Sequence, residues 1–176
     1  MRAFLAAFAL TLGLIAVAAS AEDKRAGAAA GSPYGDLQQV ELNQDQIANY
    51  IDALGDMSAA MGDAPADAAE PDDKTMTKLE GIAKKHGFKD FDDYNNVAGN
   101  IALVLDGVDP DSKAYVGSEK MIERAIAELK SDKQMSQADR RSALADLEAR
   151  RKSATQVKYK ANIDLVLKNY DKLSAD

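Results

Sequence analysis

The chain of 176 residues has no cysteine, no tryptophan and a single histidine, His86. Without cysteine there are no disulfide bonds, no thiolate metal ligands and no lipid attachment through a cysteine next to a cleavage site. A single histidine excludes a metal site built from several histidines, and neither a glycine-rich phosphate loop nor a G-x-S-x-G motif is present. We therefore expect no catalytic residues, no cofactor and no enzyme activity.

The N-terminal residues 1–21 have the three parts of a secretory signal peptide. Arg2 supplies a positive charge, residues 3–19 form an uncharged apolar run, and Ala19-Ser20-Ala21 has the small-x-small pattern of a cleavage site. The apolar run is short for a membrane-spanning helix, which needs roughly 20 residues. The pattern predicts export to the periplasm or out of the cell, and no membrane span in the mature chain.

The formal net charge of −7 excludes an overall attraction to nucleic acid or anionic lipid, so no nucleic-acid partner is expected. Residues 22–36 are rich in Ala, Gly, Ser and Pro and have little to bury, which predicts a flexible leader. Residues 62–73 include the stretch DAPADAAEPDD, whose prolines and carboxylates predict an acidic loop. The remainder of residues 37–176 is expected to form one helical domain.

Apolar residues recur at spacings of three and four in most of the domain, which is typical of amphipathic helices. Capping residues, among them Asn43, Asp90, Ser118 and Ser136, stand before several of these segments. His86 precedes Gly87 at one helix end, where a structural role is expected. The pattern predicts an all-α bundle of about six helices, with no strand and with the third helix at its centre; the helices are expected at residues 42–61, 74–86, 90–105, 119–132, 136–152 and 159–173.

The stretch LVLDGVDPDSKAYVG interrupts the helical pattern and carries three candidate metal ligands, Asp106, Asp109 and Asp111. An EF-hand loop needs oxygen ligands at positions 1, 3 and 5, glycine at 6 and glutamate at 12. Counted from Asp106, these positions do not match, so only another type of cation site remains as an alternative. The preferred interpretation is a connector built on a proline turn.

This connector is longer than a simple helix–helix link requires. Lys113, Tyr115 and Val116 follow the proline turn, and Tyr115 and Val116 are expected to pack the returning chain against the core. If the protein has a specific recognition surface, these three residues are its candidates.

Five stretches resemble a group of small exported helical proteins of uncharacterised function from Gram-negative bacteria: LNQDQIANYI, KHGFKDFDDYNNVAGNI, LDGVDPDSKAYVG, DKQMSQADR and NIDLVLKNYDKL. Residues 42–46 and 135–139 are also similar to the L-T-x-x-Q motifs of the Spy/CpxP periplasmic chaperones. The expectation is a non-enzymatic exported protein that binds a protein or another envelope component. The alternatives are a cation-binding protein that uses its acidic loops and a chaperone-like protein.

Overall fold

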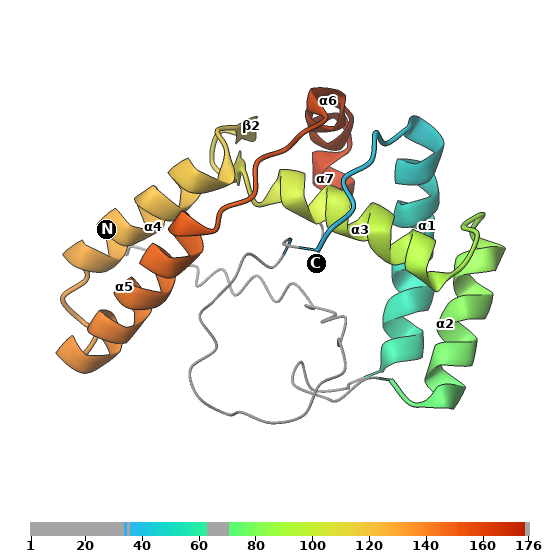
Figure 1. The fold of residues 1–176 in the computed structure, drawn as a ribbon, viewed down its shortest axis with the longest axis horizontal. Helices are drawn as coiled ribbons and strands as arrows, with labels where there is room; N and C mark the ends of the chain where they lie inside the picture. The colour runs from blue at the N-terminus through green and yellow to red at the C-terminus, as the bar shows by residue number, and fades with distance from the viewer. Residues whose placement is uncertain (1–33, 35, 63–70, 175–176) are drawn as a thin grey trace, which may run out of the picture.

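The computed structural model describes Tyr34, residues 36–62 and residues 71–174, which form seven helices and one short two-stranded ribbon (Figure 1). The predicted all-α class is confirmed, and the last expected helix is divided in two at Asn169. The elements are α1 (Gln44–Met61), α2 (Asp73–Lys85), α3 (Phe91–Leu105), β1 (Val108–Asp109), β2 (Ala114–Tyr115), α4 (Ser118–Ser131), α5 (Gln137–Lys152), α6 (Lys160–Lys168) and α7 (Tyr170–Leu173).

The predicted start of α1 is confirmed in atomic detail. The Asn43 side chain accepts a hydrogen bond from the Gln46 N–H at 2.9 Å, and the Gln46 side chain accepts one from the Asn43 N–H at 3.0 Å. This reciprocal capping box satisfies two N–H groups that would otherwise lack partners. Asp90 and Ser136 cap α3 and α5 in the expected way.

The predicted cap at Ser118 is wrong. Gly117, with φ 93°, is the residue that precedes α4, and no side chain caps this helix. The Ser118 hydroxyl donates instead to the Thr155 carbonyl at 3.4 Å. Ser118 therefore links the start of α4 to the segment that follows α5.

Helix α3 lies at the centre of the fold, as the sequence indicated. It packs against α1, α2 and α6. The centre of the Tyr94 ring lies within 6.0 Å of the centres of three other aromatic rings, those of Tyr50, Phe88 and Phe91. Seven residues of α3 are buried, more than in any other described helix: Phe91, Tyr94, Val97, Asn100, Ile101, Leu103 and Val104.

Residues 37–42, here called the arm, run without helix or strand structure along α3 and α6. Asn100 accepts a hydrogen bond from the Val40 N–H, and Asn162 donates one to the Val40 carbonyl. Asn162 also accepts from the N–H of Leu42, which is only 3% exposed. Two buried amides thus supply the hydrogen bonds that the extended backbone cannot make within itself.

The described elements form an arch (Figure 1). Helices α1 and α2 make one end, α4 and α5 make the other, and α3 spans between them. The expectation of no strand is wrong in one place, because Val108 pairs with Tyr115 and Asp109 with Ala114 in an antiparallel ribbon. The predicted signal peptide at residues 1–21, most of the leader at 22–36, and residues 63–70 of the acidic loop lie outside the described residues.

Candidate partner-binding surface

Two of the three candidate cation ligands, Asp109 and Asp111, bind Arg124 of α4. The Arg124 Nη1 lies 2.5 Å from Asp109 Oδ2, and Nη2 lies 2.8 Å from Asp111 Oδ2, while Nε donates to Glu128. Hydrogen bonds from Arg124 to Asp111 and Glu128 raise the pKa of its guanidinium, which therefore remains charged. The position beside the two carboxylates is thus taken by a cation of the chain itself.

The third candidate, Asp106, has a different environment. Its Oδ2 accepts a hydrogen bond from the Tyr34 hydroxyl at 2.7 Å. Burial raises the pKa of the Asp106 carboxyl, although the bond from Tyr34 and the nearby Arg150 act in the opposite direction. The alternative of a cation site formed by the three aspartates finds no support, because no group of three acidic or histidine side chains in the described part of the chain could hold a metal ion.

The three recognition candidates have different surroundings in the connector. Lys113, at the turn of the ribbon with φ 52°, pairs with Asp171 and lies 5.9 Å from the Tyr170 ring centre. The Tyr115 ring lies so close to Gly107 that any side chain at 107 would collide with it. Only Val116 presents an apolar side chain to solvent, with 37% of its surface exposed. Lys113 and Tyr115 therefore fix the ribbon, whereas Val116 is accessible to a partner.

His86 has the structural role that was expected. Its backbone N–H donates to the Ile82 carbonyl at the end of α2, and its Nε2 lies 2.9 Å from Asp56 Oδ2 on α1. The same carboxylate oxygen pairs with Lys85, and the bonds from His86 and Lys85 lower the pKa of Asp56. This group joins α1 to the end of α2.

Two recesses were found beside the connector. One has a volume of about 20 Å³ between Asp106, Ser118, Ile122 and Arg150, which is room for about one water molecule. The other, about 250 Å³, is lined by Lys113 and residues 167–172. Pockets for small molecules usually measure roughly 300–1,000 Å³. Both recesses are smaller than that.

Helices α4 and α5 form an antiparallel hairpin, residues 118–152, that has little buried core. Ile126 is the only buried residue of α4, and α5 buries none. Within the described chain no third helix covers the line where the two helices meet, so their apolar side chains remain half-buried. These half-buried side chains are Met121, Ile122, Ala125, Leu129, Ala143, Leu144 and Leu147.

Within the part of the chain that the structure describes, the hairpin is attached to the other elements at its base only. Helix α4 contacts β1, and the pairs from Arg124 to Asp109 and Asp111 hold that contact. The bond from Ser118 to Thr155 is made at the same end. The far end, at residues 131–136, projects away from the arch (Figure 1). Among the described residues, no other element therefore covers most of the length of the hairpin.

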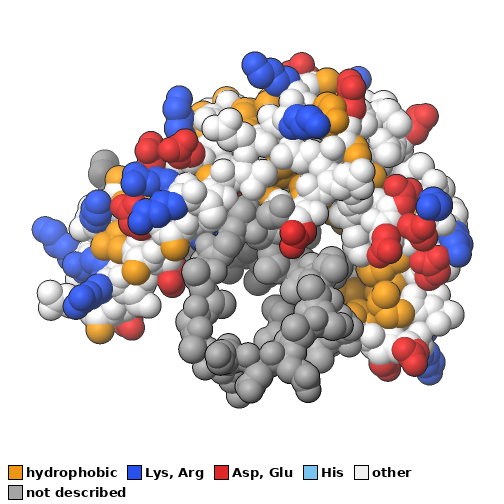
Figure 2. All heavy atoms as spheres, in the orientation of Figure 1, with side chains coloured by type: hydrophobic (Ala, Val, Ile, Leu, Met, Phe, Trp, Pro, Cys, Tyr) orange, Lys and Arg blue, Asp and Glu red, His pale blue; other side chains and the backbone are white. Residues whose placement is uncertain are grey.

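The hairpin also differs from the rest of the chain in charge. Residues 118–152 contain nine Lys and Arg against seven Asp and Glu, whereas the whole chain has 22 against 29. Figure 2 shows Lys and Arg gathered over the hairpin, and Asp and Glu gathered over α1 and α2 at the other end of the arch. The hairpin thus has a small excess of basic residues, whereas the rest of the chain has an excess of acidic ones.

Sequence reasoning missed three residues that organise this arrangement: Asn100, Asn162 and Arg124. Asn100 stands in an otherwise apolar stretch of α3, and Asn162 stands four residues before the buried Val166 on the same side of α6; a polar residue in such a place indicates a buried hydrogen-bonding role. Arg124 gave no comparable signal, because its partners in the connector, Asp111 and Asp109, are 13 and 15 residues away along the chain.

No known protein family, curated protein or solved structure matches this chain. Among the helices of the described residues, none has the length and apolar character needed to cross a membrane.

Proposed function

We propose that this protein is a non-enzymatic, exported binding protein that engages a protein partner through the hairpin of α4 and α5. The observation that carries the proposal is the exposed length of the hairpin. Two helices of 14 and 16 residues bury a single side chain, Ile126, between them and the rest of the described structure. Such a pair presents half-buried apolar side chains that a partner can cover.

Two further features support this proposal over the alternatives. The recesses at the connector are smaller than a usual small-molecule pocket, which gives no support to an enzyme. Arg124 occupies the carboxylates of Asp109 and Asp111, which favours partner binding over cation binding at the connector. Export rests on the signal-peptide pattern of residues 1–21.

The test uses changes that alter the shape of the hairpin surface but not its charge. Ala138 and Ala145 are exposed and lie seven residues apart, on the same side of α5. The double variant Ala138→Gln/Ala145→Gln keeps a good helix former at both positions and adds bulk. Ala48→Gln/Ala59→Gln makes the same change on exposed positions of α1, at the other end of the arch.

Purified wild-type protein and both double variants are used to capture proteins from an envelope extract of the protein's own cells. The expected result is a protein that the wild type and the α1 variant retain and the α5 variant loses. Equal capture by all three proteins would contradict binding of the partner on the exposed side of α5, where Ala138 and Ala145 lie. Circular dichroism of each variant checks that the helices remain formed.

A further inference from the structure

One side of α5 combines small residues with two exposed cations. Ala138, Arg141, Ala145 and Lys152 are all exposed, and their spacings of three, four and seven residues place them along one side of the helix. The alanines let another chain approach the α5 backbone closely, while Arg141 and Lys152 stand beside the approach. This side of α5 is suited to an elongated partner that lies along the helix.

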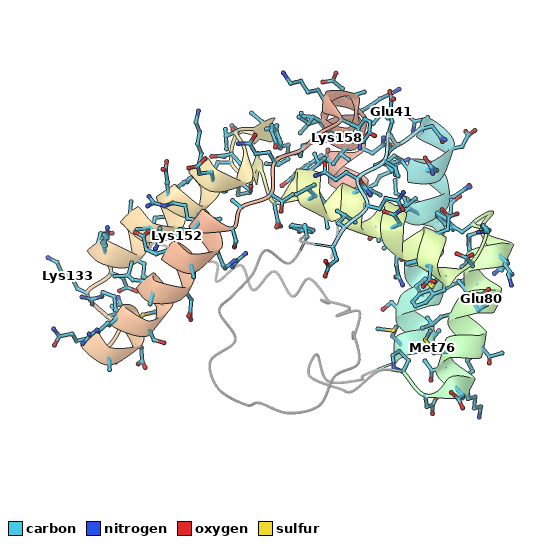
Figure 3. All side chains as sticks on the ribbon, in the orientation of Figure 1. Glu41, Met76, Glu80, Lys133, Lys152 and Lys158 are labelled. Atoms are coloured by element: carbon cyan, nitrogen blue, oxygen red, sulfur yellow. The ribbon has the colours of Figure 1, made fainter. Side chains whose placement is uncertain are left out.

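Several cations of the hairpin have no carboxylate partner among the described residues. Arg141, Lys152, Lys130 and Lys133 form no ion pair within the described part of the chain. Figure 3 shows Lys133 at the tip of the hairpin and Lys152 near its base, so the positive charge extends over its full length.

The anions nearest to Arg141 and Lys152 on the same side of α5 are already engaged. Glu148 pairs with Arg151 at 3.0 Å, and Arg151 also reaches Glu123 of α4 at 3.8 Å. Arg151 thus engages Glu148, the α5 carboxylate that stands four residues before Lys152. Arg141 and Lys152 keep no carboxylate partner among the described residues.

We infer that the partner bound by the hairpin is an acidic protein segment, rich in Asp and Glu, that lies along the Arg141–Lys152 side of α5. The inference rests on the proposed function and names the chemistry of the partner. Opposite charges accelerate the encounter of two proteins and fix the register of their contact. Ala138, Ala145 and the half-buried Leu144, which stands three residues after Arg141, supply apolar contact for a segment that is helical and has an apolar stripe.

The charge of the rest of the chain favours a protein segment over an extended polyanion. Outside residues 118–152 the chain has 13 Lys and Arg against 22 Asp and Glu, and helices α1 and α2 carry five carboxylates and four lysines. A nucleic acid or an anionic membrane would meet this excess of carboxylates as well as the hairpin. A short acidic segment touches the hairpin alone.

The test measures binding of three synthetic peptides of the same length to the purified protein by fluorescence anisotropy, at low and at moderate salt. One peptide is an amphipathic helix with Glu beside an apolar stripe, the second has Gln in place of Glu, and the third has Lys. The protein variants are Arg141→Glu/Lys152→Glu on α5 and, as matched control, Lys74→Glu/Lys78→Glu on exposed positions of α2 that form no ion pair in the described structure.

The expected result is that the Glu peptide binds more tightly than the other two peptides. The α5 double variant is expected to lower the affinity for the Glu peptide by about tenfold or more, and added salt is expected to lower it as well. The α2 double variant is expected to change the affinity by about twofold or less. Equal binding of the Glu and Gln peptides, or equal effects of the two variants, would overturn the inference. If the peptides fail while Ala138→Gln/Ala145→Gln still abolishes capture of a partner, the acidic chemistry is wrong and the hairpin proposal stands.

Anionic vesicles and a single-stranded oligonucleotide are measured in the same assay. Binding of either one that exceeds that of the Glu peptide and is lost in Arg141→Glu/Lys152→Glu would assign the face to that polyanion and overturn the inference. Self-association that the same variant abolishes would assign it to a second copy of the chain and overturn it equally.

Discussion

Asn100 and Asn162, which belong to two different helices, bind the same residue of the arm. Asn100 Oδ1 accepts from the Val40 N–H at 3.0 Å, and Asn162 Nδ2 donates to the Val40 carbonyl at 2.8 Å. Both asparagines are 2% exposed. The partly buried Val40 backbone therefore has its donor and its acceptor satisfied by side chains that lie 60 and 122 residues further along the chain.

Asn100→Ala and Asn162→Ala are each expected to destabilise the protein by roughly 1–3 kcal/mol, because each leaves buried backbone groups without a partner. The midpoint of urea unfolding measures the change. Because both side chains form hydrogen bonds to the Val40 backbone, the double variant is expected to lose less stability than the sum of the losses in the two single variants. Gln38→Ala is the control, since the exposed Gln38 contributes only its backbone carbonyl to Asn100.

A second prediction concerns two glycines inside helices. Gly55 in α1 and Gly81 in α2 are exposed, and an added Cβ at either position meets no atom within 4 Å. Gly55→Ala and Gly81→Ala are each expected to stabilise the protein by about 0.5–1 kcal/mol, because alanine loses less backbone entropy in a helix. A loss of stability in urea unfolding would contradict the helical backbone at that position.

Gly99 in α3 supplies the matched contrast. A Cβ there would lie 2.7 Å from Leu37 Cδ1, so the Leu37 side chain would have to move. Gly99→Ala is therefore expected to raise the free energy of unfolding by less than Gly55→Ala does. The difference between the two variants reports how closely the arm packs on α3.

Helix ends were predictable from the sequence because their determinants are local. Asn43 and Gln46 are three residues apart, and a capping box depends on that spacing alone. Asn100 and Asn162 could not be assigned partners in this way, because their hydrogen bonds to the arm span 60 residues or more. Of the candidate site, the sequence indicated the connector and the two helices at residues 119–132 and 136–152, but the engagement of Asp109 and Asp111 by Arg124 depends on how α4 is placed.

The third prediction is a pH dependence at Asp106. Burial raises the pKa of its carboxyl above 3.8, so the folded state binds a proton more readily than the unfolded state. Stability from this group is therefore greatest below pH 3.8 and decreases as the pH rises through the folded-state pKa. Asp106→Asn keeps an acceptor for Tyr34 and removes the charge, so this variant is expected to be more stable than wild type at pH 7 and equal below pH 3.8.

Asp109→Asn is the control for this pH dependence, with the opposite sign. Backbone N–H groups, first that of Ser112, lower the pKa of Asp109 below 3.8. Its contribution is present above pH 3.8 and is lost as the pH falls through the folded-state pKa. Asp109→Asn should therefore be less stable than wild type at pH 7. The urea unfolding midpoint of each variant is compared with that of the wild type at pH 7 and below pH 3.8. If at pH 7 both variants were more stable than the wild type, or both less stable, the environments assigned to Asp106 and Asp109 would be contradicted.

The fourth prediction concerns calcium at the connector. Wild-type protein is expected to show no calorimetric signal with micromolar calcium, because Arg124 holds Asp109 and Asp111. Arg124→Gln frees two adjacent carboxylates, whose mutual repulsion favours a cation between them, so this variant is expected to gain weak, millimolar binding. Tight binding of calcium to the wild type at the connector would show that the carboxylates leave Arg124.

The fifth prediction is that the hairpin opens more easily than the centre of the fold. Amide protection against hydrogen exchange reflects local opening, which needs little free energy where few side chains are buried. Helix α3 buries seven residues, α2 buries Leu79 and Ala83, and α4 and α5 together bury only Ile126. Mass spectrometry of exchange is therefore expected to give the slowest amides in α3, intermediate ones in α2 and faster ones in the hairpin.

Within the hairpin, exchange should be fastest at the tip, residues 131–136, because the ties made by Arg124 and Ser118 are near the base. Arg124→Gln should then raise the exchange rate at the base and leave the tip unchanged. Hairpin amides as slow as those of α3 would mean that another part of the chain or a second copy covers α4 and α5. Slower exchange confined to the hairpin on adding the Glu peptide would locate the bound peptide on these two helices.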